Sequence, residues 1–180
     1  MIINVSSVYM EKEKHSLLIE ELLEEAKGWP VFPGKKIFVT GSQQDHREFY
    51  DLLENLGMYA VSEDHDWGDR NWNKQTNTEL SPIKAIVDRY MLRSVSTKRS
   101  FVSERVQELC NAVKATGAQG VVSYTYKYDD APSWDVPEEK AALGEMNIPM
   151  LQLMNRPLKL FKDKDTENLL KAFADEIKEG

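Results

Sequence analysis

Apolar and polar positions change period repeatedly along the chain from Lys35 onward. Short β-branched or apolar runs, typical of buried strands, alternate with segments whose apolar residues recur every three or four positions, as they do in helices. The strand-like runs lie at 36–40, 58–61, 120–126 and 148–154. Strands that alternate with helices indicate parallel pairing through right-handed crossovers. We therefore expect an α/β domain of the Rossmann or flavodoxin type, with three layers and a four-stranded parallel sheet.

The first 34 residues follow a different pattern. Residues 7–27 carry leucines at helical spacing among Glu and Lys, which predicts a single amphipathic helix. Gly28, Pro30 and Pro33 then break that pattern. The expected organisation is an N-terminal helix and linker over 1–34, followed by the α/β domain over 35–180.

Two helix starts in the α/β domain show capping signatures. Asp45 is followed three residues later by Glu48, and Asp135 is followed by Glu138, with Pro137 in the first turn. Further helices are predicted at 82–91, 101–116 and 169–177 from their apolar spacing.

Composition removes several classes of function. The chain has 180 residues and a net charge of −7, so it lacks the basic surface of a nucleic-acid-binding protein or of a protein that binds an anionic membrane. It has neither a run long enough to span a bilayer nor the pattern of a signal peptide. Its single cysteine, Cys110, excludes an internal disulfide and favours a cytoplasmic setting. The helical spacing around Cys110 predicts a buried, structural thiol.

Four loops are expected at the carboxyl edge of the sheet, where open α/β domains bind ligands. Ser42 and Gln43 follow the first strand and could bind an anion at a helix N-terminus, although a plain tight βα turn is the favoured interpretation. No complete dinucleotide or P-loop motif is present. No spacing indicates a catalytic triad, so catalytic residues remain unknown.

Two of these loops are acidic. Asp64-His65-Asp66 and Asp69 could meet Asp129, Asp130 and Asp135 around a metal, or the same acids could be helix caps and solvated charges. Arg70 and Lys127 could instead neutralise them as ion pairs. No residue is assigned as a metal ligand. The residues that we expect to bind a ligand are Ser42, Gln43, His65, Trp67, Arg70, Lys127, Asp129, Asp130 and Trp134.

Tryptophans are concentrated in the same loops. Trp67, Trp72 and Trp134 lie there, and only Trp29 lies elsewhere. Because tryptophan is large and apolar, three interpretations are open: an aromatic pocket, an interface with a partner, or a small core folded over the sheet edge.

Three segments of the chain resemble the C-terminal domain of the 2-hydroxyacyl-CoA dehydratase and benzoyl-CoA reductase subunits. They are Ile37–Ser42; Glu63-Asp64 with Trp67–Arg70, Ser81-Pro82 and Arg89-Tyr90 before the helix with Arg105; and Gly120–Lys127 with Asp130, Trp134-Asp135, Pro137 and Asn147–Leu151. The resemblance covers roughly 35–154. It implies radical acyl-CoA chemistry by two related subunits, each with an iron–sulfur cluster, supplied with electrons by an ATP-driven activator.

The chain departs from that pattern at the cysteines. Asp129 stands where the resemblance implies a cluster ligand, the break at 94–100 has no cysteine, and Cys110 matches no ligand position. We therefore predict a cluster-free domain or fragment of such a protein, with a related subunit or a missing N-terminal domain as partner and acyl-CoA as the implied ligand. The alternatives are a small-ligand or metal-dependent enzyme that uses the acidic loops, and a non-catalytic interaction module.

Overall fold

The computed structural model describes residues 2–44, 46–65, 68–69, 75–93, 95, 100–158 and 163–177. The chain forms two compact units, Met1–Pro33 and Gly34–Gly180. The second unit is the α/β domain. Among the described residues, none of the helices combines the length and the apolar character needed to cross a membrane.

The first unit contains two helices, α1 (Ile2–Tyr9) and α2 (Lys12–Ala26). The expectation of one helix over 7–27 is therefore wrong. The backbone leaves the helical region at Glu11, whose ψ is 138°, so the chain starts a new helix there. Within this unit His15 Nε2 lies 3.1 Å from Ser6 Oγ, which joins the two helices.

The α/β domain is built on four strands: β1 (Lys35–Gly41), β2 (Met58–Asp64), β3 (Gly120–Tyr126) and β4 (Met150–Arg156). Their order in the sheet is β2-β1-β3-β4, and every pair is parallel. This confirms the predicted fold class. The strand order reverses between β1 and β3, which is the topological switch point at which open α/β sheets bind ligands.

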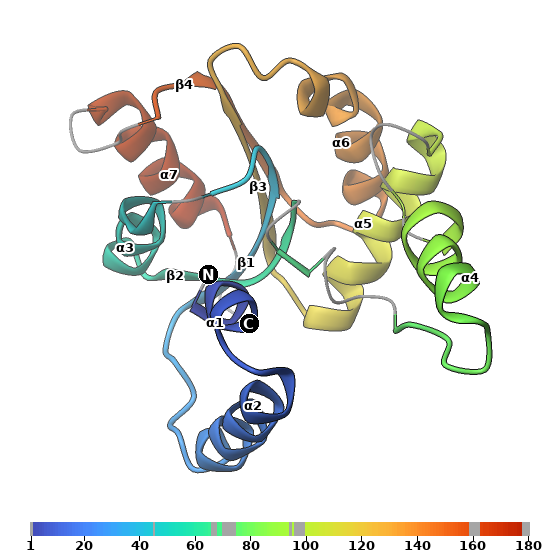
Figure 1. Cartoon of the computed structure of the whole chain (residues 1–180). Coiled ribbons are helices and arrows are strands. Elements are labelled where there is room, and N and C mark those ends of the chain that lie inside the picture. Colours follow the sequence, from blue (N-terminus) through green and yellow to red (C-terminus); the bar gives the residue numbers. More distant parts are fainter. Residues whose placement is uncertain are drawn as a thin grey trace. The chain divides into compact units, whose positions relative to one another are not determined.

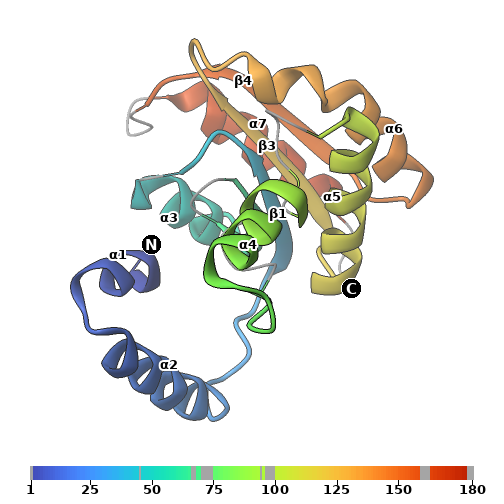
Figure 2. The ribbon, with the colours of Figure 1, turned by 45° about the vertical axis from the view of Figure 1, so that its right-hand side comes forward.

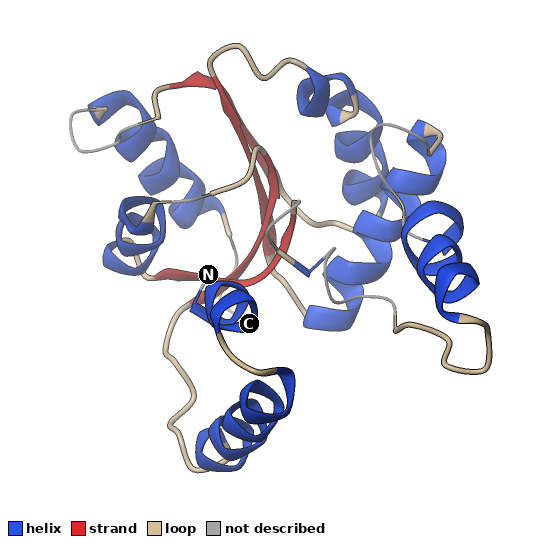
Figure 3. Cartoon of the chain, in the orientation of Figure 1, coloured by secondary structure: helices blue, strands red, loops and turns tan. Residues whose placement is uncertain are grey.

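Helices cover both faces of the sheet (Figure 1). One face carries α3 (Arg47–Asn55) and α7 (Lys164–Glu176), and the other carries α5 (Val102–Thr116) and α6 (Val136–Glu145). Figure 2 shows the same layers after a turn of 45°, and Figure 3 shows the strands in red between the helices in blue. The remaining helical segments are α4 (Pro82–Val87), its π-helical continuation η2 (Asp88–Arg93) and η3 (Ala131–Trp134).

Each face of the sheet has its own hydrophobic cluster. On the α3/α7 side, buried residues of β1, β3 and β4 pack against both helices; they include Val39, Val122, Tyr124, Leu153, Phe49, Leu53, Leu170 and Phe173. On the α5/α6 side, the cluster includes Phe38, Val121, Leu109, Val113 and Leu143. Successive strand residues alternate between these two clusters, as the pleat of a strand requires.

Gly41 lets the loops after β1 and β3 approach each other. Its φ is +104°, and a Cβ atom at this position would collide with the carbonyl oxygen of Tyr124. The next residue, Ser42, donates its backbone N–H to that same oxygen at 2.8 Å. The switch point is therefore a place of close backbone contact that requires glycine.

Candidate functional site at the carboxyl edge of the sheet

A row of polar residues crosses the sheet near its carboxyl edge. Asp64 of β2 is in register with Thr40 of β1, Thr40 with Ser123 of β3, and Ser123 with Gln152 of β4. We call these four residues the polar row. Residues in register point to the same face. Phe38 and Val121, two positions before Thr40 and Ser123, belong to the α5/α6 cluster, so the polar row lies on that face.

The first turns of α5 and α6 lie over the polar row. Both helices are crossovers between parallel strands, so they run opposite to the strands. Leu143 of α6 packs in one cluster with Val121 of β3. Glu139 lies one turn nearer the start of α6 than Leu143, and Ser123 lies two residues nearer the end of β3 than Val121. Both residues are therefore displaced toward the carboxyl edge of the sheet. By the same reasoning Arg105, one turn before Leu109 on α5, comes over the end of β1 and β2.

Arg105 and Asp135 form a two-point ion pair between α5 and α6. Arg105 Nε lies 2.5 Å from Asp135 Oδ2, and Nη2 lies 2.6 Å from Oδ1. Asp135 does occupy the N-cap position of α6, but its side chain makes no capping hydrogen bond, which corrects the predicted role. The carboxylate binds the guanidinium instead of the backbone N–H groups of α6. The hydrogen bonds to Asp135 raise the pKa of Arg105, and burial opposes this shift without cancelling it.

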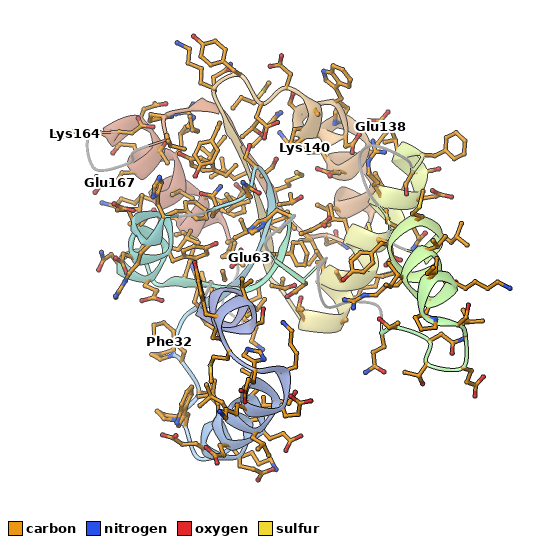
Figure 4. All side chains as sticks on the ribbon, in the orientation of Figure 1. Phe32, Glu63, Glu138, Lys140, Lys164 and Glu167 are labelled. Atoms are coloured by element: carbon orange, nitrogen blue, oxygen red, sulfur yellow. The ribbon has the colours of Figure 1, made fainter. Side chains whose placement is uncertain are left out.

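Glu139 is a buried carboxyl group beside this ion pair. Burial, together with the nearby carboxylates of Asp135 and Asp64, raises its pKa to about 8, although Arg105 opposes the shift. Glu139 is therefore mostly protonated at pH 7. Its neighbours Glu138 and Lys140 are exposed and are labelled on α6 in Figure 4.

Ser42 and Asp129 meet at the switch point, as the topology predicts for residues that follow adjacent strands. Ser42 Oγ donates to Asp129 Oδ2 at 2.5 Å and accepts the backbone N–H of Tyr126 at 3.0 Å. Gln44 joins this network, because its Nε2 donates to the Ser42 carbonyl at 3.0 Å and its Oε1 accepts from Tyr126 Oη at 3.1 Å. The loops after β1 and β3 are thus tied together by side chains.

The other predicted site residues are distributed more widely. Lys127 Nζ lies 5.0 Å from the centre of the Tyr128 ring, a cation–π distance. Gln43 and Asp130 are exposed, and Trp134, in η3, is 74 % exposed. Trp67 and Arg70 lie outside the described residues, as do Asp45, Asp66 and Trp72.

His65 belongs to a hydrogen-bond network on the α3 side of β2, on the other face of the sheet from the polar row. It pairs with Glu63, whose Oε2 also accepts a hydrogen bond from Tyr50 Oη of α3 at 2.8 Å. Burial tends to raise the pKa of Glu63, but the hydrogen bonds from His65 and Tyr50 outweigh it and lower the pKa. Glu63 is labelled near the sheet in Figure 4. Among the described residues, no group of three His, Cys, Asp or Glu side chains is arranged to hold a metal.

A cavity of about 270 Å³ opens beside the polar row. It lies between β2 and α5, and its walls include Phe38, Ser62, Asp64, Arg105 and Ala112. Asp64 therefore belongs both to this cavity and to the polar row, and Arg105 belongs both to the cavity and to the ion pair above that row. Ser62 Oγ donates to the carboxylate of Asp69 at the cavity wall.

Cys110 does not fit a cluster ligand. The thiol is buried on α5 in the cluster with Val106, Leu109 and Val113, and burial raises its pKa, so the thiolate form is disfavoured. A four-iron cluster requires about four thiolates, and the chain has one cysteine. The residues of this chain therefore do not fit an iron–sulfur cluster of the kind that the sequence resemblance implies.

Sequence reasoning did not single out Arg105, Glu139, Ser123 or Thr125 as a site. One signal was available for the strand: Val121, Ser123 and Thr125 alternate with Val122, Tyr124 and Tyr126, which places two hydroxyls on one face. The helix residues carried no comparable signal, because their approach to the strand depends on how α5 and α6 pack.

The fold and these contacts define a Rossmann-type α/β domain with a polar layer and a bridged switch point at one edge. The chain belongs to the family described as 2-hydroxyglutaryl-CoA dehydratase, D-component, whose family model matches residues 1–155.

Its curated relatives are β subunits of 2-hydroxyacyl-CoA dehydratases. The chain is 23 % identical to the (R)-phenyllactyl-CoA dehydratase β subunit of Clostridium sporogenes over 174 residues, which is 96 % of this chain and 46 % of that protein. It is 28 % identical to the lactoyl-CoA dehydratase β subunit of Anaerotignum propionicum over 149 residues, which is 81 % of this chain and 40 % of that protein. The chain thus spans less than half the length of these relatives.

Proposed function

We propose that this chain is an α/β domain of a 2-hydroxyacyl-CoA dehydratase-type protein, that it works within an acyl-CoA complex, and that it holds no iron–sulfur cluster of its own. The observation that carries the proposal is the position of the one thiol. In a chain that belongs to this family, Cys110 is buried among apolar side chains of α5. At the switch point Ser42 donates a hydrogen bond to Asp129, the residue that stands where the sequence resemblance implies a thiolate ligand.

Anaerobic reconstitution with iron and sulfide tests the cluster-free part. We expect the purified chain to retain no stoichiometric iron, and we expect a Cys110→Ala variant to behave identically. Four irons and four sulfides for each chain, with thiolate-to-iron absorption that disappears in Cys110→Ala, would overturn the proposal. A thermal melt of both proteins checks that they are folded before reconstitution.

An exposed apolar surface supports the complex part. α4 and η2 present Ile83, Ile86, Tyr90, Met91 and Leu92 to solvent, while Ala85 is the buried residue of α4. Adjacent exposed apolar side chains of this size are typical of interaction surfaces. The occupant that we propose is the rest of a dehydratase protein, because the relatives extend for more than half of their length beyond the matched part.

Affinity purification from the native cells, with the partners identified by mass spectrometry, tests this surface. We expect a dehydratase polypeptide to accompany the wild-type chain and to be lost with Ile86→Glu. Leu169→Glu is the matched control, since Leu169 is an exposed apolar residue on α7. Recovery of the chain alone, or equal recovery of the dehydratase polypeptide with both variants, would contradict the proposed partner surface.

A further inference from the structure

Three buried polar atoms on the α5/α6 side of the sheet have no hydrogen-bond partner among the described residues. They are Ser123 Oγ, Thr125 Oγ1 and Glu139 Oε2. Their residues are 1 %, 3 % and 8 % exposed, so bulk solvent does not reach them. A buried polar atom without a partner is costly, and buried polar atoms in native proteins nearly always have one, either a protein group or an ordered water.

The three atoms belong to one layer. Ser123 and Thr125 are two residues apart on β3, so both side chains point to the face that carries Val121. Glu139 is one helical turn from Leu143, which packs in the same cluster as Val121. One helical turn advances about 5.4 Å and two strand residues advance about 6.6 Å, so Glu139 and Ser123 are displaced by similar distances from that cluster toward the carboxyl edge of the sheet.

The charges around this layer define the chemistry of what it can hold. Asp135 of α6 and Asp64 of β2 face Glu139 with negative charge, Arg105 of α5 faces it with positive charge, and Glu138 contributes weakly from its own helix. The guanidinium of Arg105 is already bound to Asp135 at two points. An added anion would be repelled by the carboxylates, and no group of three His, Cys, Asp or Glu ligands among the described residues could hold a metal.

The atoms that lack partners are two hydroxyls and one carboxyl oxygen. A hydroxyl can both donate and accept a hydrogen bond, so the matching ligand is a small neutral molecule that does the same. We propose that the layer is a hydrated site, in which ordered water bridges Glu139 Oε2 to the hydroxyls of Ser123 and Thr125. Asp64 and Arg105, whose charges act on Glu139, also line the cavity between β2 and α5.

A near-isosteric substitution tests the proposal by the sign of its effect. Thr125→Val replaces the hydroxyl with a methyl group of similar size. If water is bound, the variant loses a hydrogen bond, and we expect the equilibrium constant for unfolding to rise roughly fivefold. If the layer is dry, the variant removes an unpaired group and becomes more stable than the wild type, which would overturn the proposal.

The reverse substitution on the other face is the control. Val122→Thr places a hydroxyl among the apolar residues of the α3/α7 cluster, and we expect it to destabilise the protein. A high-resolution crystal structure of the wild-type protein gives a second readout that does not depend on folding of the variants. We expect solvent density within about 3.2 Å of Glu139 Oε2 and of at least one hydroxyl. Continuous protein packing with no density there would also overturn the proposal.

Discussion

The two faces of the sheet each carry an apolar cluster but differ in chemistry at the carboxyl edge. One residue before the polar row on each strand, Val39, Val122 and Leu151 are in register, and their side chains point to the α3/α7 face. Val39 and Val122 are fully buried in the apolar cluster of that face. On the α5/α6 face lies the polar row itself, with Thr40, Ser123 and Gln152 in register. The helices over it carry the buried Arg105–Asp135 ion pair and the buried carboxyl group of Glu139. A shift of one residue along each strand therefore separates an apolar core from a polar one.

This difference indicates that the α3/α7 face mainly stabilises the fold, whereas the α5/α6 face carries groups suited to a functional site. Apolar burial stabilises the fold without demanding partners. Polar groups in the interior must all be satisfied, and they are retained at a cost. A perturbed carboxyl group beside a charged pair and a cavity is typical of a functional site, whereas the α3/α7 face has the composition of a structural core. Three predictions test this contrast.

The largest expected effect is the dependence of stability on pH that Glu139 causes. Its pKa is about 8 in the folded protein against an ordinary value of 4.5. The folded state binds this proton more tightly than the unfolded state, so the free energy of unfolding falls as pH rises from 4.5 through 8. At about 1.4 kcal/mol for each pKa unit, the loss is at most about 5 kcal/mol. We expect Glu139→Gln to remove it.

Denaturant unfolding at pH 5, 7 and 9 measures this loss as the difference between the wild type and Glu139→Gln. The variant is expected to be the more stable protein at pH 9. Glu138→Gln, at an exposed position of the same turn, is the matched control and is expected to follow the wild type. Parallel pH profiles for the wild type and Glu139→Gln would show that the two faces do not differ in this respect.

The Arg105–Asp135 pair gives the next largest effect. Arg105→Ala leaves the Asp135 carboxylate, whose side chain is only 5 % exposed, without its cation. Breaking a buried pair in this way costs about 3 kcal/mol or more. Arg47→Ala breaks an exposed pair with Asp51 on α3 and is expected to change the unfolding curve little. Equal unfolding midpoints for the two variants would contradict the view that the polar face depends on its buried charges.

The strands and the order of elements followed from the sequence because short β-branched runs and helical spacing are local signals. The convergence of the loops that hold Ser42 and Asp129 on one edge also followed, since parallel strands end at the same edge of a sheet. Their hydrogen bond depends on β1 and β3 being neighbours, a strand order that was not predicted. The break between α1 and α2 was missed because Glu11 is an ordinary helix-forming residue, and no Gly or Pro marks the position at which the backbone leaves the helical region. Glu139 could not be separated from Glu138 by sequence, because the two differ only in which side of α6 they occupy. Arg105 and Asp135 are 30 residues apart, and their pairing depends on helix packing.

Ser42 lies at the switch point, directly after β1 at the carboxyl edge of the sheet. Its substitution is expected to give the smallest of the three effects. Ser42→Ala removes the acceptor of the Tyr126 N–H and the donor to Asp129 together. We expect a loss of about 1–2 kcal/mol, because two part-buried hydrogen bonds of the Ser42 hydroxyl are removed together. Ser133→Ala, which removes an exposed hydroxyl bonded to the Asp130 carbonyl in the same loop, is the control. Amide hydrogen exchange provides the sharper measurement: Tyr126 should exchange faster in Ser42→Ala than in Ser133→Ala, while Val122, deep in β3, should stay protected in both. Unchanged exchange at Tyr126 would mean that backbone pairing alone closes the switch point, and the Ser42–Asp129 bridge would then have no structural role.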